Sequence, residues 1–410
     1  MEDFFRVKPV AEARTELFLN WEPMPLKVET VPLTAAFGRV LAEPIRSHEN
    51  IPPYNRSTVD GYAVRAADTF GASEALPALL TVVEDIPMGV VAERPLMLGE
   101  VSSIATGGML PEGADAVAMI EFTEKLDDTT VAVLRPVAPG ENVIRAGEDV
   151  MAGEELFTAG QRLRPADVGA LATLGITAVP VWRKPRVAIL STGDEIVAPG
   201  ETPGPGKIRD SNSYSLGAAV QATGGEPLYL GLVPDEYEAV LAGVQRGLAT
   251  ADLVLLSGGS SVGVRDVAAK VLADLGPPGV LVHGVALRPG KPLLLALCQS
   301  KPVFGLPGHP VSALVTFDLF VRPAVERLLG VSAKQRPYVR ARLGRNVASA
   351  AGREDHIRVR LVEAETGLVA EPVFGKSGLI TTLAQADGTI VIPAAYEGLR
   401  AGVEVEVYLL

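Results

Sequence analysis

Between residues 184 and 329, short apolar runs alternate with longer segments of mixed polarity, and this alternation constrains the fold more than any other feature of the sequence. Runs of this length predict buried strands, and the segments between them predict helices. Strands that alternate with helices at this spacing favour a doubly wound parallel sheet. The expected strands lie at 186–190, 228–232, 252–256 and around Phe304, and the expected helices begin near residues 210, 235, 264 and 310.

The segments on either side of this region predict mainly β structure. From about 46 to 151, short apolar runs alternate with Gly and Pro turns, which is typical of a β-rich domain. From 336 to 410, stretches such as 356–361 and 403–408 alternate polar with apolar residues, which predicts a small antiparallel barrel or sandwich. Two further helices are expected, at 7–20, opening near Pro9, and at about 165–174, ending at Gly175.

The charge and cysteine content exclude several classes of function. The chain has 410 residues and a formal net charge of −12, so it repels polyanions at long range and we expect no nucleic-acid partner. No stretch approaches the roughly 18 apolar residues of a membrane helix, and the N-terminus is not that of a secretory signal, so we expect a cytoplasmic protein without a membrane partner. The single cysteine, Cys298, excludes an internal disulfide and a thiolate zinc cluster, and its apolar surroundings predict an inert buried thiol.

Three polar, glycine-rich loops follow expected strands and carry the first candidate binding residues. Ligands of open α/β sheets bind at loops that leave the carboxyl ends of the strands. Glycines let the backbone approach a phosphate, and free N–H groups at a helix start favour anions. A tight turn explains each loop taken alone, whereas three on one sheet edge predict a site for a phosphate-bearing ligand. The loops are Ser191-Thr-Gly-Asp-Glu195, Ser257-Gly-Gly-Ser-Ser-Val-Gly263 with Asp266 just inside the next helix, and Gly305-Leu-Pro-Gly-His-Pro310.

The segment Arg288-Pro-Gly-Lys-Pro292 places two cations beside a turn. Lys291 is a candidate anchor for a phosphate or another oxyanion, and Arg288 is a candidate for bidentate contacts. A solvated surface turn also explains these residues. The segment is not a P-loop, because Val285 stands where the first glycine is required and Pro292 where Ser or Thr is required. We therefore reject nucleotide hydrolysis through that motif.

The β-rich segment adds carboxylate and hydroxyl side chains beside glycine turns, among them Asp60, Thr106 and Asp149. Asp60 and Asp149 are candidates to bind a hard cation such as magnesium or to position a nucleophile. Helix-capping and turn chemistry explain them equally well. Of the four histidines, only His309 lies in a candidate loop, and a structural role is its simpler explanation.

Seven short motifs occur together and in one order along the chain, and the set is far more specific than any member. On these motifs the chain resembles the MoeA family, whose eukaryotic relative is the E domain of gephyrin. The resemblance runs essentially from end to end. The motifs are Asp60-Gly-Tyr-Ala63, Thr106-Gly with Pro111-Glu-Gly-Ala-Asp115, Gly147-Glu-Asp149, Ser191-Thr-Gly-Asp-Glu195, Ser257-Gly-Gly259 with Ser261-Val-Gly263, Pro289-Gly-Lys-Pro292 and Leu306-Pro-Gly-His-Pro-Val-Ser312.

The resemblance implies a multidomain α/β plus β protein that forms a homodimer. Its active cleft is expected between the α/β domain of one subunit and the β-rich insert of the other. Four domains are implied: a linker domain of two segments (1–45 and 152–183), a β-rich insert domain (46–151), a central doubly wound α/β pterin-binding domain (184–329) and a C-terminal β-barrel (330–410).

The resemblance also implies an activity, that of a molybdopterin molybdenumtransferase. Molybdate and adenylyl-molybdopterin would give molybdenum cofactor and AMP, with magnesium. Two positions depart from the family pattern, because Arg288 stands where many members carry Lys and His309 where some carry Asn. By matching motifs, the expected catalytic residues are Asp60, Thr106, Asp149, Glu195 and Lys291. The expected binding residues are Asp235, Ser257, Gly258, Gly259, Asp266, Arg288, Pro307, Pro310 and Ser377, of which Asp235 and Ser377 match by short local context alone. The expected magnesium ligands are Glu195, Asp235 and Asp266.

Two rival functions remain open at this point. A molybdopterin adenylyltransferase resembles the α/β domain alone, and the β-rich insert and the barrel argue against it; such an enzyme is instead the expected upstream partner. A non-catalytic scaffold of the gephyrin kind is the second rival, and the absence of a long disordered or charged linker gives it no support.

Overall fold

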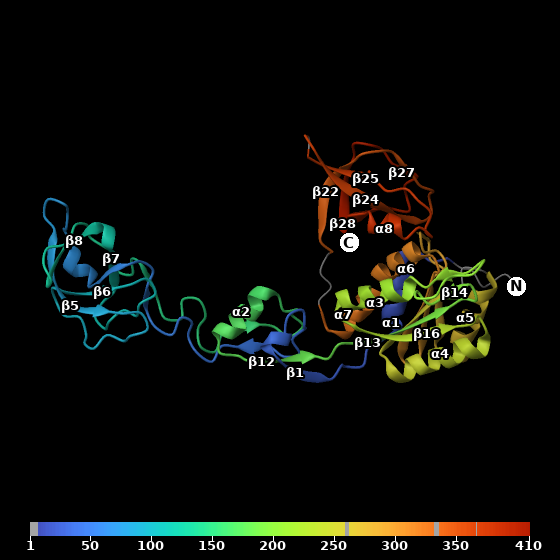
Figure 1. Ribbon diagram of the computed structural model, residues 1–410, viewed down its shortest axis with the longest axis horizontal. Helices are drawn as coiled ribbons and strands as arrows, with labels where there is room; N and C mark the ends of the chain where they lie inside the picture. The colour runs from blue at the N-terminus through green and yellow to red at the C-terminus, as the bar shows by residue number, and fades with distance from the viewer. Residues whose placement is uncertain (1–6, 259–261, 332–335, 366) are drawn as a thin grey trace. The chain divides into compact units, whose positions relative to one another are not determined.

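The computed structural model describes residues 7–258, 262–331, 336–365 and 367–410, without the side chains of 262–266. The chain forms two compact units (Figure 1). The first contains the described residues up to 29, together with 38–40 and 181–410, and the second contains 30–37 and 41–180. Among the described helices, none is long and apolar enough to cross a membrane.

The first unit contains a six-stranded sheet. In spatial order its strands are β16 (Glu226–Val233), β13 (Arg186–Thr192), β17 (Leu253–Gly258), β21 (Lys301–Leu306), β20 (Leu294–Cys298) and β18 (Gly279–His283). β13 pairs in parallel with β16 and with β17, and β17 pairs in parallel with β21. The predicted parallel strands are therefore confirmed, and their carboxyl ends lie along one edge.

One side of this sheet differs from the prediction, because β20 runs antiparallel to both β21 and β18. The link between β20 and β21 is Gln299 and Ser300, whose φ angles are 53° and 62°. Two successive residues in the left-handed region form a two-residue hairpin turn. The chain therefore reverses directly, without the crossover helix that a parallel neighbour requires.

Helices cover both faces of the sheet, as a doubly wound fold requires. Val187 and Ile189 of β13 share one core cluster with α1, α3, α6 and α7, whereas Ala188 and Leu190 share another with α4 and α5. Successive strand residues point to opposite faces, so one apolar run supplies both cores. The helices are α1 (Val10–Asn20), α3 (Asn212–Thr223), α4 (Tyr237–Thr250), α5 (Val262–Asp274), α6 (Pro310–Thr316) and α7 (Arg322–Leu328) (Figure 1).

Three details of this domain bear on the sequence predictions. The helix expected to begin near residue 310 is interrupted by a π-helical stretch at Phe317–Val321. α1, which the family resemblance assigned to the linker domain, packs its Leu17 into the core of the α/β domain. Cys298 is fully buried and burial raises the pKa of its thiol to about 11, so the predicted inert thiol is confirmed.

The C-terminal part of the first unit is a closed barrel, one of the two predicted forms. Its strand order is β24 (Glu354–Ala364), β25 (Gly367–Pro372), β22 (Tyr338–Leu343), β28 (Glu404–Leu409) and β26 (Gly388–Ile392), with a further β24–β26 pairing that closes the ring. Val359, Ile390 and Val407 lie in its core. β19 (Leu287–Arg288), from the segment that precedes β20, pairs in parallel with β24. The backbone thus fixes the segment that carries Arg288 to the barrel.

The second unit contains another six-stranded sheet, which confirms the β-rich prediction. Its strand order is β7 (Ala116–Met119), β4 (Gly61–Val64), β6 (Glu100–Ile104), β5 (Ala78–Ile86), β9 (Thr130–Val133) and β8 (Thr123–Lys125). Val64, Val101 and Val131 lie in its core.

The remaining elements are short. The paired strands are β1 (Val28–Pro32) with β12 (Ala178–Trp182), β2 (Ile45–Arg46) with β11 (Glu155–Phe157), β3 (Arg56–Ser57) with β10 (Val143–Ile144), β14 (Ile196–Val197) with β15 (Ile208–Arg209), and β23 (Val347–Ala348) with β27 (Gly398–Leu399). The remaining α-helices are α2 (Pro165–Thr173) and α8 (Thr381–Ala384).

Gly61 tests the close approach of β4 and β7. A Cβ at this position would lie 1.9 Å from the carbonyl oxygen of Ala118, a backbone atom that cannot move without disturbing the β4–β7 pairing. We expect Gly61→Ala to lower the free energy of unfolding by about 1–3 kcal/mol, the usual cost of overpacking, as measured by urea unfolding.

Gly169, in α2 of the same unit, provides the control, because a Cβ there meets nothing within 4 Å. Gly169→Ala is expected to leave the free energy of unfolding unchanged or to raise it by up to about 1 kcal/mol. Equal effects of the two substitutions would contradict the close approach at Gly61.

Candidate functional site

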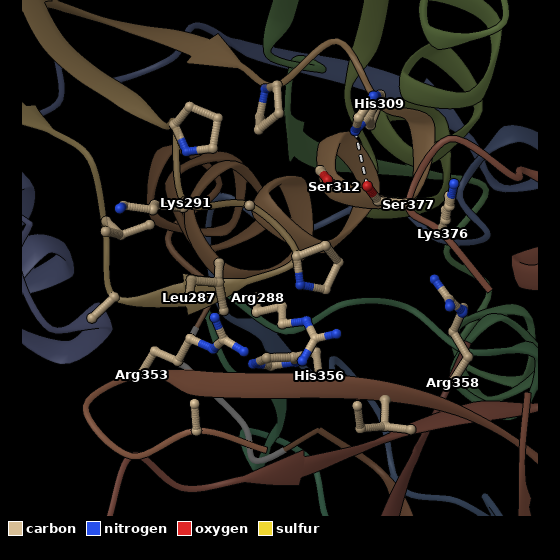
Figure 2. Close-up of a pocket in the computed structure, with 18 of the residues that line it drawn as sticks. Leu287, Arg288, Lys291, His309, Ser312, Arg353, His356, Arg358, Lys376 and Ser377 are labelled. Carbon is tan, nitrogen blue, oxygen red and sulfur yellow. Dashed lines mark hydrogen bonds between the residues drawn. The ribbon is translucent and has the colours of Figure 1, made fainter. Parts of the chain in front are cut away.

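A pocket of about 910 Å³ lies in the first unit, between loops of the α/β domain and one side of the barrel (Figure 2). The α/β domain contributes residues 285–292 and 307–309, and the barrel region contributes 350–353, 356–358 and 373–377. Sites for small organic ligands commonly have volumes of about 300–1,000 Å³. The pocket is therefore large enough for a substrate of cofactor size.

Five cationic side chains line this pocket, while none of the described lining residues is Asp or Glu. This is an unusual concentration in a chain of net charge −12. Cations gathered in a concave site with few countercharges produce a local positive potential that attracts anions. The five are Arg288 and Lys291 of the α/β domain and Arg353, Arg358 and Lys376 of the barrel region, all labelled in Figure 2.

Arg358 is the most buried of these cations, with 8% of its surface exposed. Its Nη2 donates a 2.8 Å hydrogen bond to the carbonyl oxygen of Gly375, while its buried Nε has no hydrogen-bond partner among the described residues. Burial lowers the pKa of Arg358, because desolvation disfavours the charged form. A bound anion would restore the interactions that Arg358 loses on burial.

Ser377 and His309 lie at the same pocket and contact each other. The Ser377 hydroxyl and Nδ1 of His309 are 2.9 Å apart (Figure 2). Pro307 lines the pocket, and Pro310 is the first residue of α6. The structure thus brings together Arg288, Lys291, Pro307 and Ser377 of the residues expected from the family motifs, and His309 lies among them.

A second group of expected residues lies at the carboxyl ends of β13, β16 and β17. The Ser257 hydroxyl is buried and accepts a 2.8 Å hydrogen bond from Nδ2 of Asn212, which also donates to the carbonyl oxygen of Gly308 at 2.9 Å. Asn212 therefore connects the carboxyl end of β17 to a loop that lines the pocket. A Cβ on Gly258 would lie 2.1 Å from the carbonyl oxygen of Thr192, so close packing of β17 on β13 accounts for this glycine.

Carboxylates gather at the same edge, around Asp235. Burial raises the pKa of Asp235, a hydrogen bond from the Thr192 hydroxyl opposes this effect, and nearby Asp194 and Glu195 raise the pKa further. Within the described residues, Oδ1 of Asp235 is buried without a hydrogen-bond partner. Among all the residues that the structure describes, no group of three or more His, Cys, Asp or Glu side chains is arranged to hold a metal ion.

Two expected binding residues cannot be placed. Gly259 lies outside the described residues, and the side chain of Asp266 is not described although its backbone belongs to α5. The magnesium set of Glu195, Asp235 and Asp266 therefore stays a prediction.

The third group lies in the second unit. Oδ1 of Asp60 accepts hydrogen bonds from the backbone N–H of Thr106 at 2.7 Å and from its hydroxyl at 2.8 Å. These bonds lower the pKa of Asp60 below its ordinary value, because they stabilise the carboxylate form. Asp149 is exposed and, in the described structure, shares no hydrogen bond or ion pair with Asp60 or Thr106. The structure thus joins two of the three predicted residues of this unit.

Four residues at the site carry no motif that would mark them in the sequence: Arg353, Arg358, Lys376 and Asn212. Arg358 lies in the alternating stretch 356–361, where a polar residue suggests a solvent-exposed position, and the structure turns that face toward the pocket. Asn212 lies where a helix is expected to begin, and a polar residue at such a position is explained by helix capping alone. Arg353 and Lys376 are single cations in separate loops, so only the closure of the barrel brings them together with Arg358.

Comparisons with known proteins cover nearly the whole chain. Three family profiles match it: the MoeA N-terminal region (domain I and II) over residues 8–175, the probable molybdopterin binding domain over 188–327, and the MoeA C-terminal region (domain IV) over 340–410. Among curated relatives, a molybdopterin molybdenumtransferase of Bacillus subtilis is 35% identical over 388 residues, covering 94% of this chain and 90% of that protein. A putative molybdopterin biosynthesis protein of Methanocaldococcus jannaschii is 37% identical over 394 residues, covering 94% and 92% respectively.

The fold has a counterpart among solved structures. The crystal structure of a molybdopterin biosynthesis MoeA protein from Pyrococcus horikoshii matches with a TM-score of 0.83 and 36% sequence identity. The match covers 99% of this chain and 100% of that one.

The Asp60–Thr106 contact yields a direct test. We expect Thr106→Val to raise the pKa of Asp60 part of the way toward the ordinary value of about 3.9, because the hydroxyl donor is lost while the backbone donor remains. Titration of the side-chain carboxyl carbon by NMR measures the shift.

Thr129→Val is the matched control. Asp127 accepts the same pair of hydrogen bonds from Thr129, and these lower its pKa in the same way. This substitution is expected to raise the pKa of Asp127 alone. An unchanged Asp60 titration in Thr106→Val would show that the hydroxyl contact is absent in solution.

Proposed function

The chain belongs to the MoeA family, and from this membership we propose that it is a molybdopterin molybdenumtransferase, which transfers molybdenum from molybdate to adenylyl-molybdopterin and releases AMP. The observation that carries this proposal is the pocket with five cations and no acidic lining residue among those described. Of the two substrates of the proposed reaction, molybdate is a tetrahedral oxyanion and adenylyl-molybdopterin contains a phosphoanhydride. Positively charged side chains attract the negative oxygens of both.

The chemistry of the lining residues fits anion transfer. Arginine offers paired N–H donors that match phosphate-like oxygens, and lysine offers a compact charge. We propose that Arg288 and Lys291 neutralise molybdate and phosphate oxygens, and that the unpartnered Nε of Arg358 adds a further donor. As the phosphoanhydride breaks, negative charge accumulates on the departing AMP, and fixed cations stabilise that charge without reorganisation.

The carboxylates around Asp235 fit a hard divalent cation such as magnesium. Oδ1 of Asp235 is buried without a partner in the described structure, and the neighbouring Asp194 and Glu195 increase the local negative charge. Oxygen ligands of this kind suit magnesium. We propose that Glu195 and Asp235, with Asp266, hold it near the pterin, where it would supply charge to the phosphate.

The acidic residues of the second unit fit a role in a homodimer. The pocket lacks a carboxylate among its described lining residues, whereas Asp60 is exposed and held as a carboxylate by Thr106. We propose that Asp60, Thr106 and Asp149 of one subunit complete the site of the other. A cytoplasmic location, and an adenylyltransferase as the supplier of the substrate, are part of the same proposal.

The two rivals account for less of the structure. A single-domain adenylyltransferase would lack the barrel region, which supplies Arg353, Arg358 and Lys376 to the pocket. A scaffold would have no use for a buried arginine with an unpartnered donor. The proposed transfer of molybdenum gives a role both to the cations of the barrel region and to the unpartnered Nε of Arg358.

Lys291 provides the first test of the activity. We expect Lys291→Ala to lower the rate of molybdate-dependent AMP release by about 100-fold, the usual effect of removing one charge-stabilising donor. Lys125→Ala, at an exposed lysine of the second unit paired with Asp128, is the control and should keep the native rate. Pyrophosphate release in place of AMP would favour the adenylyltransferase.

Mixed dimers provide the second test. Asp60→Asn and Lys291→Ala chains are expected to be inactive alone. If each site takes Lys291 from one subunit and Asp60 from the other, equal mixing after subunit exchange restores about a quarter of the native activity, because half of the dimers are mixed and each has one intact site. No recovery, with mixed dimers shown by mass spectrometry, would place both residues in one subunit's site.

A further inference from the structure

One acidic side chain, Asp355, lies beneath the cationic pocket and contacts two of its arginines. Asp355 is in β24 and is fully buried, with 0% of its surface exposed. Its Oδ2 lies 3.3 Å from Nη1 of Arg288, and its Oδ1 accepts a 3.0 Å hydrogen bond from Nε of Arg353. Each carboxylate oxygen therefore has one guanidinium partner.

The pairing of β19 with β24 places Arg288 beside Asp355. Arg288 is the register partner of Asp355 where β19 pairs with β24, so the two α-carbons are neighbours across the ladder. Arg353 precedes Asp355 by two residues. Figure 2 shows the side chains of Arg288 and Arg353 close together in the pocket, above the strand that carries Asp355.

The two guanidiniums would otherwise have considerable freedom. The side chain of Arg288 is 57% exposed and that of Arg353 is 38% exposed. A long exposed side chain samples many rotamers, and fixing it costs conformational entropy each time a ligand binds. A buried carboxylate that holds both in advance reduces this cost.

We propose that Asp355 is a positioning residue, which orients Arg288 and Arg353 so that their remaining N–H donors converge on one tetrahedral oxyanion. This inference rests on the proposed function, because molybdate is the oxyanion concerned. Asp355 does not line the pocket and acts through the two arginines.

An effect of charge alone and an effect of positioning change the molybdate affinity of Asp355→Asn in opposite directions. Removing a negative charge beside an anion site strengthens the attraction for an anion. If Asp355 only reduced the positive charge, Asp355→Asn would tighten molybdate binding. If Asp355 positions the arginines, the same substitution weakens binding although the pocket becomes more positive.

The experiment measures molybdate and sulfate binding to the full-length protein by isothermal titration calorimetry. We expect Asp355→Asn to weaken both by about tenfold or more, the scale of a charge-assisted hydrogen bond. Asp355→Glu keeps the charge and is expected to recover affinity to within about threefold of the native protein, since one methylene shifts the carboxylate but leaves it able to pair. In steady-state assays the loss should appear in the KM for molybdate more than in kcat.

Asp252→Asn is the matched control. Asp252 accepts two hydrogen bonds from Arg183, at 2.8 Å and 2.7 Å, and lies outside the pocket. This substitution removes the same charge and breaks a similar pair in the same unit. It should lower the unfolding temperature without changing molybdate affinity, which separates loss of stability from loss of positioning.

A double-mutant cycle shows whether Asp355 acts through the arginines. In a chain that carries Arg288→Gln and Arg353→Gln, we expect Asp355→Asn to cause no further weakening. If Asp355→Asn does not fold, Arg353→Lys is the substitute variant, because it leaves the charge of the pocket unchanged. Weaker sulfate binding by Arg353→Lys supports the positioning role of Asp355, and sulfate binding equal to that of the native protein overturns this role.

The outcomes separate this inference from the proposed function. If the native protein binds neither molybdate nor sulfate, the proposed function fails, and this inference fails with it. If the native protein binds both and Asp355→Asn binds them equally or more tightly, only the positioning role is overturned. Weaker binding by Asp355→Asn that persists in the double-Gln background also overturns it, because the effect would then not pass through the arginines.

Discussion

Repulsion between like charges is the constraint on which this structure depends. Five cations line one pocket, and contacts within the fold hold the three arginines among them against that repulsion. The β19–β24 ladder fixes the backbone at Arg288, the buried Asp355 pairs with Arg288 and Arg353, and the Gly375 carbonyl accepts a hydrogen bond from Arg358. An anion in the pocket relieves the remaining repulsion, so the same arrangement that strains the free protein favours its ligand.

The candidate carboxylates and the cations of the pocket lie in different parts of the molecule. Carboxylates that suit a cation lie around Asp235 at the sheet edge, and Asp60 is held ionised in the second unit. The cations lie between the α/β domain and the barrel. Asn212 connects the two regions of the first unit, because its amide bonds both Ser257 and Gly308. The proposed reaction binds molybdate, breaks a phosphoanhydride and releases AMP, so it has a use for both kinds of site: cations for the oxyanions and carboxylates for the proposed magnesium.

Much of the fold follows from local patterns, and the exceptions have physical causes. Apolar runs such as 186–190 predict the parallel strands, because a strand buried on both faces is apolar throughout. The antiparallel β20 escapes prediction because Gln299 and Ser300 form its turn without the Gly or Asn that usually marks one. At the site, motifs locate Lys291 and Pro307, whereas Arg353 and Arg358 become pocket residues only when the barrel closes beside the α/β loops. Pairing across 67 residues, as between Arg288 and Asp355, leaves no local trace in the sequence.

The order of the pocket segments along the chain has a consequence for synthesis. Arg288 and Lys291 leave the ribosome well before Arg353, Arg358 and Lys376, and β19 has no partner strand until β24 has been synthesised. Domains fold from the N-terminus as they emerge. A nascent or prematurely terminated chain that ends before Arg353 therefore carries only two of the five cations, so a folded α/β domain alone does not form the cationic pocket.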